Sequence, residues 1–103
     1  MDGLGRFAEP GVLILASLGD GPKHGYALIK DIEGFAGVKL GAGTLYSALA
    51  KLEQAGLVEA LPAEERRRPY QITVAGREFL YQRLTESARI AEVGLRRIAV
   101  ASS

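Results

Sequence analysis

The sequence predicts a mainly helical domain that carries one small β-hairpin and ends in a long helix. Three observations predict this fold class. Apolar residues recur at helical spacing in successive stretches before Gly56. Two short stretches of strand-forming residues then flank a polar turn that has a proline at each end. From Thr73 onward the chain follows a helical pattern almost to its C-terminus.

Length and composition limit the class of protein. With 103 residues, of which 48% are hydrophobic, the chain is long enough for one domain with a modest core. Its formal charge is only +1, so attraction for a polyanion must come from local arrangement. The absence of cysteine excludes disulfides and thiol catalysis, and it fits a cytoplasmic protein. Residues 12–18 form the longest apolar run, which is too short for a membrane span, and the segment before it is a poor signal peptide.

The first part of the chain predicts two helices joined by a tight turn. Residues 1–8 are expected to be a loose segment or an arm. A helix over residues 10–18 begins with proline, which is tolerated at a first helical position, and its apolar composition places it in the core. A glycine- and proline-rich turn at residues 19–22 precedes a second helix over residues 24–35. The side chains expected on the inner face of the second helix are Tyr26, Ile29, Ile32 and Phe35, with Leu28 beside them.

The stretch over residues 41–58 predicts a short helix that ends abruptly. Leu45, Leu49 and Leu52 recur at the spacing of one buried stripe, and Gly56 suits a left-handed C-cap. The opposite face is small and weakly cationic, and a DNA major groove admits a helix face of this kind. The residues of this outer face are Gly43, Ser47, Ala50, Lys51 and Gln54, with Thr44 and Tyr46 at its edges.

Residues 57–61 and 70–73 predict the two strands of a hairpin. The connection between them, residues 62–69, is polar and includes three consecutive arginines. A hairpin with such a tip, placed after two helices joined by a glycine-bearing turn, predicts a winged helix-turn-helix over residues 1–73.

The last helix is predicted to run from Val74 to about Val100, with Thr73 as its N-cap and Gly76 tolerated in its first turn. A helix on the order of 40 Å long is too long to lie against so small a domain. We therefore expect residues 74–103 to form a dimerisation helix within one compact unit, in preference to a helix folded back on its own core. The predicted interface residues are Leu80, Leu84, Ala88, Ala91, Leu95 and Ile98, and a second apolar stripe contains Phe79, Ile90 and Val93.

A set of short motifs appears in the order and spacing of a known family. The motifs are His24-Gly25-Tyr26, Gly43-Thr44-Leu45-Tyr46, then Leu49, Leu52, Glu53, Gly56, Leu57 and Val58, Arg66-Arg67-Arg68, Tyr70, and Thr73-Val74-Ala75-Gly76-Arg77. Together they cover residues 10–80, and this part of the chain resembles the PadR-type winged-helix transcriptional regulators.

The resemblance implies a homodimeric repressor that binds a near-palindromic operator and is relieved by a small apolar or aromatic effector. It also implies that the central helix enters the major groove, that the wing contacts the backbone or the minor groove, and that the C-terminal helix holds the dimer together. Because little of the chain follows Thr73, it resembles the short members of the family. The family often has Ser-Pro in place of Gly41-Ala42 and proline in place of Ser47, and the second difference puts a hydroxyl on the exposed face.

The predicted DNA contacts lie at the start of the second helix, along the central helix and at the hairpin tip. Arginines at a tip beside a groove-sized helix favour phosphate contacts over a solvated loop balanced by Glu64 and Glu65. Tyr46 suits a ring that packs and a hydroxyl offered to a phosphate, in preference to a core position. The predicted DNA contacts are Lys23, Tyr26, Thr44, Tyr46, Ser47, Lys51, Arg66, Arg67 and Arg68.

Other chemistry finds little support in the sequence. His24 has no partner at metal-ligand spacing, so we expect it to be a local hydrogen-bonding residue. Gly41-Ala42-Gly43 fails as a dinucleotide fingerprint because Tyr46 stands where the third glycine belongs. No catalytic constellation, metal or cofactor is predicted. Two other functions stay open: a winged-helix protein-interaction module without DNA binding, and a ligand slot between two C-terminal helices.

Overall fold

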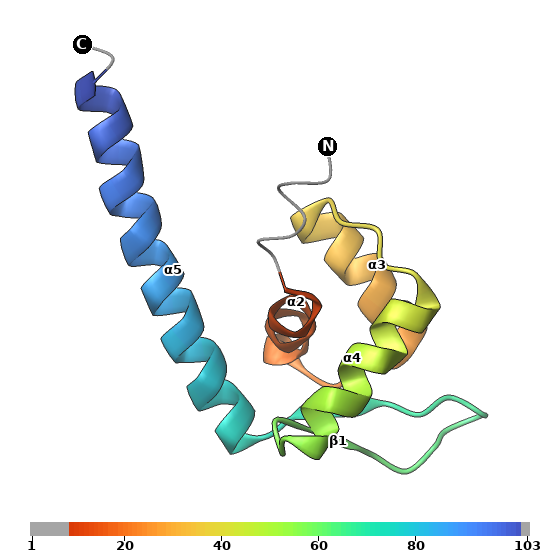
Figure 1. Ribbon diagram of the computed structural model, residues 1–103. Helices are drawn as coiled ribbons and strands as arrows, with labels where there is room; N and C mark the ends of the chain where they lie inside the picture. The colour runs from red at the N-terminus through yellow and green to blue at the C-terminus, as the bar shows by residue number, and fades with distance from the viewer. Residues whose placement is uncertain (1–8, 102–103) are drawn as a thin grey trace.

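The structure is a computed structural model that describes residues 9–101. The predicted fold class, mainly helical with a winged helix-turn-helix and a long C-terminal helix, is confirmed. In Figure 1 the first three helices and the hairpin form one body, and the last helix leaves it as a separate rod. The expectation for residues 1–8 lies outside the described residues. The elements are α2 (Pro10–Ser17), a 3₁₀ turn (Leu18–Asp20), α3 (Gly25–Ala36), α4 (Ala42–Gln54), β1 (Val58–Ala60), β2 (Tyr70–Ile72) and α5 (Val74–Ala101).

The core lies between α2, α3 and α4. As predicted, α2 is central: it packs against α3, α4 and α5, and its Ile14 and Leu15 are fully buried. The predicted stripe of α4 is also confirmed, because Leu45, Leu49 and Leu52 are all buried in the same cluster. Burial of this stripe leaves the opposite face of α4 at the surface.

The inner face of α3 differs from the prediction. Leu28 and Ile32 are fully buried, whereas Tyr26 is 65% exposed and Phe35 is 53% exposed. Each residue turns an α-helix by about 100°, so a step of three residues falls short of a full turn by about 60°. Two such steps separate Tyr26 from Ile32, which therefore lie about 120° apart around the axis. Phe35 lies in the last turn of α3, which contains no fully buried side chain. The pair at spacing of four residues, Leu28 and Ile32, therefore forms the buried face, and Tyr26 is free to act at the surface.

The hairpin is antiparallel, and Val58 pairs with Ile72 at its base. Gly56, with φ of 79°, ends α4 in the predicted left-handed conformation and leads the chain into β1. A pairing that the sequence did not predict joins Lys23 to Tyr70: each backbone N–H donates to the other residue's carbonyl, at 3.1 and 2.9 Å. The segment just before α3 therefore adds to the edge of β2, which fixes the wing beside the start of α3.

The start of α5 is fixed by a cap and a close approach. The Thr73 hydroxyl accepts a hydrogen bond from the Gly76 N–H at 3.0 Å, as predicted for an N-cap, and donates to the Gly56 carbonyl at 2.7 Å. Gly76 is required rather than tolerated, because a Cβ at this position would lie 2.1 Å from the backbone oxygen of Leu57. The first turn of α5 thus packs directly on the chain that enters β1.

Beyond its first turns, α5 leaves the body. Leu80 was predicted to lie in the dimer interface, but it is partly buried against the domain's own core. Leu84 is 46% exposed and Leu95 is 68% exposed, and the alternative of a helix folded back on its core is therefore wrong. Arg83 donates to Glu9 at 3.0 Å, which joins the base of α5 to the start of α2. Its guanidinium also lies 5.5 Å from the centre of the Phe79 ring in the same helix.

Candidate nucleic-acid interface

The exposed face of α4 is a row without charge. Gly43, Ser47, Ala50 and Gln54 recur on the side opposite the buried stripe, and all four are exposed. At about 100° per residue, Tyr46 lies on one edge of this row, and Thr44 and Lys51 lie on the other edge. The helix therefore presents a smooth centre with polar groups along both sides.

One edge of the row is built by α4 and α3 together. The phenol of Tyr46 lies on Gly25, the first residue of α3: a Cβ at Gly25 would stand 2.2 Å from the Tyr46 hydroxyl oxygen. Tyr46 is nevertheless 50% exposed, so its ring packs while part of it reaches the surface. Burial and the neighbouring Glu53 carboxylate raise the pKa of Tyr70. The glycine of His24-Gly25-Tyr26 is thus explained by a contact that spacing alone could not reveal.

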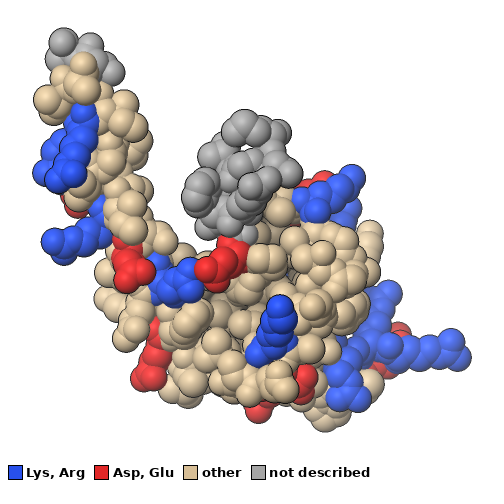
Figure 2. All heavy atoms as spheres, in the orientation of Figure 1, with Lys and Arg blue, Asp and Glu red and all other residues tan. Residues whose placement is uncertain are grey.

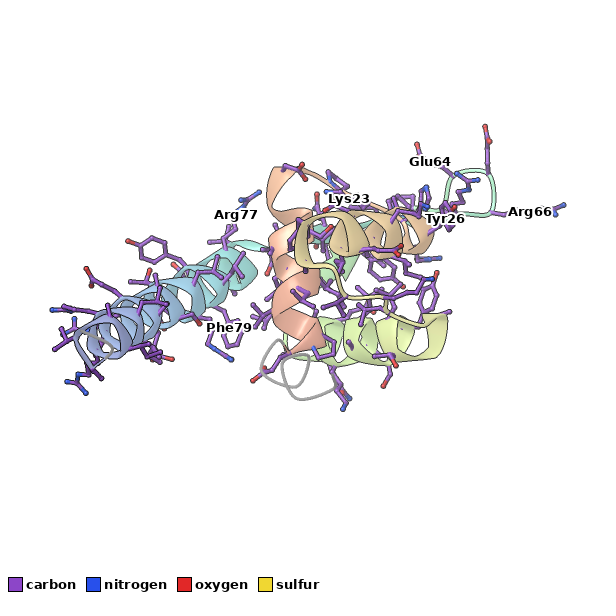
Figure 3. The ribbon with its side chains drawn as sticks, turned by 90° about the horizontal axis from the view of Figure 1, so that it is seen from above. Lys23, Tyr26, Glu64, Arg66, Arg77 and Phe79 are labelled. Atoms are coloured by element: carbon purple, nitrogen blue, oxygen red, sulfur yellow. The ribbon has the colours of Figure 1, made fainter. Side chains whose placement is uncertain are left out.

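The wing closes in a tight turn in which the three arginines are not equivalent. The backbones of Glu64 and Arg67 bond to each other at 2.6 and 2.8 Å, and Glu65 and Arg66 between them have φ of 48° and 70°. Figure 3 shows Arg66 pointing outward from the tip. Arg67 instead turns back toward α3, where its Nη1 lies 3.3 Å from Nε2 of His24. Basic side chains gather at the wing end of the body in Figure 2.

Lys23 lies at the start of α3, as predicted, but its ammonium is bound within the chain. Its ammonium donates to the carboxylate of Asp20 and to the carbonyl of Ser17, and its side chain is only 17% exposed. The Lys23 hydrogen bond and charge lower the pKa of Asp20. Because its donors are directed into the connection between α2 and α3, Lys23 acts as a structural residue there.

The other candidates lie on the two sides of the α4 row. Tyr26 is at the wing end of α3 in Figure 3. At the same end of this helix, Tyr46 lies on Gly25 and Arg67 lies beside His24. Thr44, Ser47 and Lys51 line a hollow of about 720 Å³ on the other side, together with the start of α2. Eight of the nine predicted contacts are therefore exposed. The ninth, Lys23, differs because its ammonium is already bound by Asp20 and Ser17.

His24 has the predicted local role. Its Nδ1 accepts a hydrogen bond from the Ala27 N–H at 3.4 Å, so it is the N-cap of α3. Its second contact, with Arg67, was not predicted, because the two residues are 43 positions apart and are joined only through the tertiary fold. Within residues 9–101, no cluster of three or more His, Cys, Asp or Glu side chains could hold a metal ion.

A sequence model of the transcriptional regulator PadR-like family matches residues 14–82, more than half of the chain. The chain belongs to the PadR-like family of transcriptional regulators. PadR-like proteins regulate transcription and are not enzymes. The described part of this PadR-like chain contains no helix with the length and hydropathy of a membrane span.

Solved structures and a curated relative agree with this assignment. A transcriptional regulator from Clostridium thermocellum has a TM-score of 0.77 and 30% identity, over 90% of this chain and 92% of that chain. A PadR family transcription regulator from Clostridium difficile R20291 has a TM-score of 0.75 and 27% identity, over 82% of this chain and 92% of that chain. An uncharacterized 37.1 kDa protein in transposon TN4556 of Streptomyces fradiae is 46% identical over 86 residues. That match covers 84% of this chain and 25% of the relative, so this chain spans about a quarter of the relative's length.

Proposed function

We propose that this PadR-like chain is a homodimeric repressor that acts in the cytoplasm and binds a near-palindromic DNA operator. The observation that carries the proposal is the exposed row of Gly43, Ser47, Ala50 and Gln54 on α4. A surface helix that faces only water usually carries charged side chains on its outer face. A row that is exposed, uncharged and narrow is suited instead to the floor of the major groove.

The flanks of this row support the same orientation on DNA. Arg66 and Arg68 are exposed and form no ion pair with another described residue, so their charges are free for phosphates. Tyr46 on one flank and Lys51 on the other are placed to contact the two backbones that border a groove. In this proposal the wing contacts the backbone or the minor groove beside the half-site.

Homodimerisation is proposed for the exposed part of α5. Leu84, Ala88, Ala91, Leu95 and Ile98 are spaced four and three residues apart in turn, which is the spacing of a coiled-coil seam. Large apolar side chains along one exposed face commonly mark an interface. Because Leu80 belongs to the domain's own core, the proposed seam begins at Leu84. A small apolar or aromatic effector bound between the two α5 helices would relieve repression by changing the distance between the two DNA-binding halves.

The test is a titration of the protein with two duplexes of equal length at several salt concentrations. One duplex carries the DNA upstream of the protein's own gene, and the other has the same composition in random order. We expect tighter binding to the first duplex, and for both a linear fall of log K with log salt, by about 0.9 per phosphate contacted. No salt-dependent binding to either duplex would reject the proposal.

That negative result would favour the second candidate, a winged-helix module that binds another protein. The near-zero net charge of the chain, +1, is the observation in its favour, because such a chain has no long-range attraction for DNA. The two candidates therefore differ in one measurable quantity, the salt dependence of binding to duplex DNA.

A further inference from the structure

The side chain of His24 lies between two hydrogen-bond donors. On one side the Ala27 N–H is 3.4 Å from Nδ1. On the other side the Arg67 guanidinium is 3.3 Å from Nε2. The ring therefore joins the start of α3 to the hairpin tip, and both of its nitrogens face an N–H group.

A neutral imidazole has one nitrogen with a lone pair and one nitrogen that carries hydrogen, whereas a guanidinium has donors only. His24 can accept from Ala27 or from Arg67, but not from both. With Nδ1 accepting as the cap of α3, Nε2 carries hydrogen and faces the Arg67 N–H as a second donor. Two donors then converge on one place, and the group that satisfies both is an acceptor, above all an anionic oxygen.

The surroundings leave this place open to a ligand. A cleft of about 590 Å³ between the start of α3 and the wing is lined by His24 and Arg67, among other residues. Neither Glu64 nor Glu65 forms an ion pair with Arg67 within the described chain, although both line the same cleft. Lys23, the other cation of the cleft, is already bound to Asp20. The Arg67 charge is therefore the one available for an incoming anion.

We propose that the Nε2–H of His24 and the guanidinium of Arg67 together bind one phosphodiester of the DNA backbone. This inference rests on the proposed function and adds a residue, His24, to which sequence and structure otherwise give only a capping role. The two glutamates of the cleft favour a phosphodiester, which carries one negative charge, over a free phosphate dianion. One phosphate held from both α3 and the wing would fix the angle at which the wing meets the DNA.

The test uses the full chain, His24→Asn, Arg67→Gln and the double variant. Asparagine keeps the N-cap of α3 but is too short to share a phosphate with Arg67. Arg66→Gln is the matched control, since Arg66 points outward from the same tip. Thermal unfolding of each variant checks that the fold is intact. The probe is a duplex selected for binding to the wild-type protein, prepared as a set in which one phosphate at a time is replaced by a neutral methylphosphonate.

We expect each single variant to weaken binding about tenfold, and the double variant to weaken it by less than the product of the two single effects, because both groups share one ligand. One methylphosphonate position should weaken the wild type and Arg66→Gln most, weaken His24→Asn and Arg67→Gln less, and leave the double variant almost unaffected. Unchanged affinity of His24→Asn, additive effects, or the same methylphosphonate sensitivity in all variants would overturn the inference while leaving DNA binding itself established. Competition by inorganic phosphate at constant ionic strength would also overturn it, since the site would then take a free anion. If the wild type binds no duplex in a salt-dependent way, the proposed function fails and this inference fails with it.

Discussion

Tyr46 of α4 and Gly25 of α3 share a space that holds only one of their side chains. The Tyr46 phenol occupies the place where a Cβ of residue 25 would be, 2.2 Å from its hydroxyl oxygen and 2.8 Å from the adjoining ring carbon. Residue 25 thus sets how closely the two helices of the helix-turn-helix approach each other, and Tyr46 keeps its hydroxyl beside the start of α3.

Gly25→Ala is expected to destabilise the fold by roughly 1–3 kcal/mol, because the added methyl group must displace the Tyr46 ring. The measurement is urea unfolding of the variant and of the wild type. Gly34→Ala, in the same helix but with no atom within 4 Å of the added methyl group, is the control. It should be neutral or stabilising by up to about 1 kcal/mol. If both variants behave alike, the Tyr46 contact does not constrain residue 25.

Gly76→Ala is expected to detach the first turn of α5 from the hairpin. Here the obstacle is the backbone oxygen of Leu57, which cannot turn aside as a side chain can. We expect a destabilisation at the upper end of the roughly 1–3 kcal/mol typical of overpacking, or more. Gly94→Ala, further along α5 and in open space, should leave the stability unchanged or raise it by up to about 1 kcal/mol. Unfolding curves of the two variants, measured side by side, test the difference.

Replacement of Arg66, Arg67 and Arg68 by alanine is expected to weaken binding to all duplexes alike. Removal of each phosphate contact should flatten the slope of log K against log salt by about 0.9. The slope is measured by anisotropy titration at several salt concentrations. A slope equal to that of the wild type would place the wing away from the DNA.

Ser47 and Lys51 are expected to affect the choice of sequence more than the salt slope. Alanine at either position should change the relative affinity among operator variants by roughly 1–3 kcal/mol for each specific base interaction that it removes. Competition between single-base variants of a selected duplex measures this change. An equal weakening on operator and random DNA would show instead that the residue binds the backbone.

Leu95→Asp is expected to disrupt the dimer, whereas Leu80→Asp is expected to destabilise the domain. Leu95 is 68% exposed, so its replacement should give a folded monomer with weak, half-site binding. Leu80 packs against the domain's own core, so the same change there should lower the stability of the domain itself. Sedimentation gives the oligomeric state and thermal unfolding gives the stability. A dimeric Leu95→Asp protein with normal operator binding would place the interface elsewhere.

Local patterns predicted much of the fold. The stripe of Leu45, Leu49 and Leu52 was visible as spacing, and so were the end of α4 at Gly56 and the cap at Thr73. These features depend on residues close together in the chain, and their physical requirements appear in the sequence itself.

Features that depend on the shape of a turn or on distant residues were missed. Asp20 and Ser17 are close to Lys23 in the chain, but only the shape of the turn before α3 directs their oxygens to its ammonium. Its backbone pairing with Tyr70 joins parts of the chain that no local pattern connects. The exposure of Tyr26 was missed for a different reason, since two spacings fit the second helix and only its packing against α2 and α4 decides between them.

The contact of Arg83 with Glu9 has a geometric consequence beyond its energy. An ion pair this exposed contributes little to stability, because water screens the two charges. Yet it holds the base of α5, a helix of 28 residues, against the start of α2. A tilt of only ~5° at that base would move the far end of a helix roughly 40 Å long by about 3.5 Å. In the proposed homodimer, the pair would act at the fulcrum of a lever whose angle determines how far apart two half-sites can stand and still both be bound.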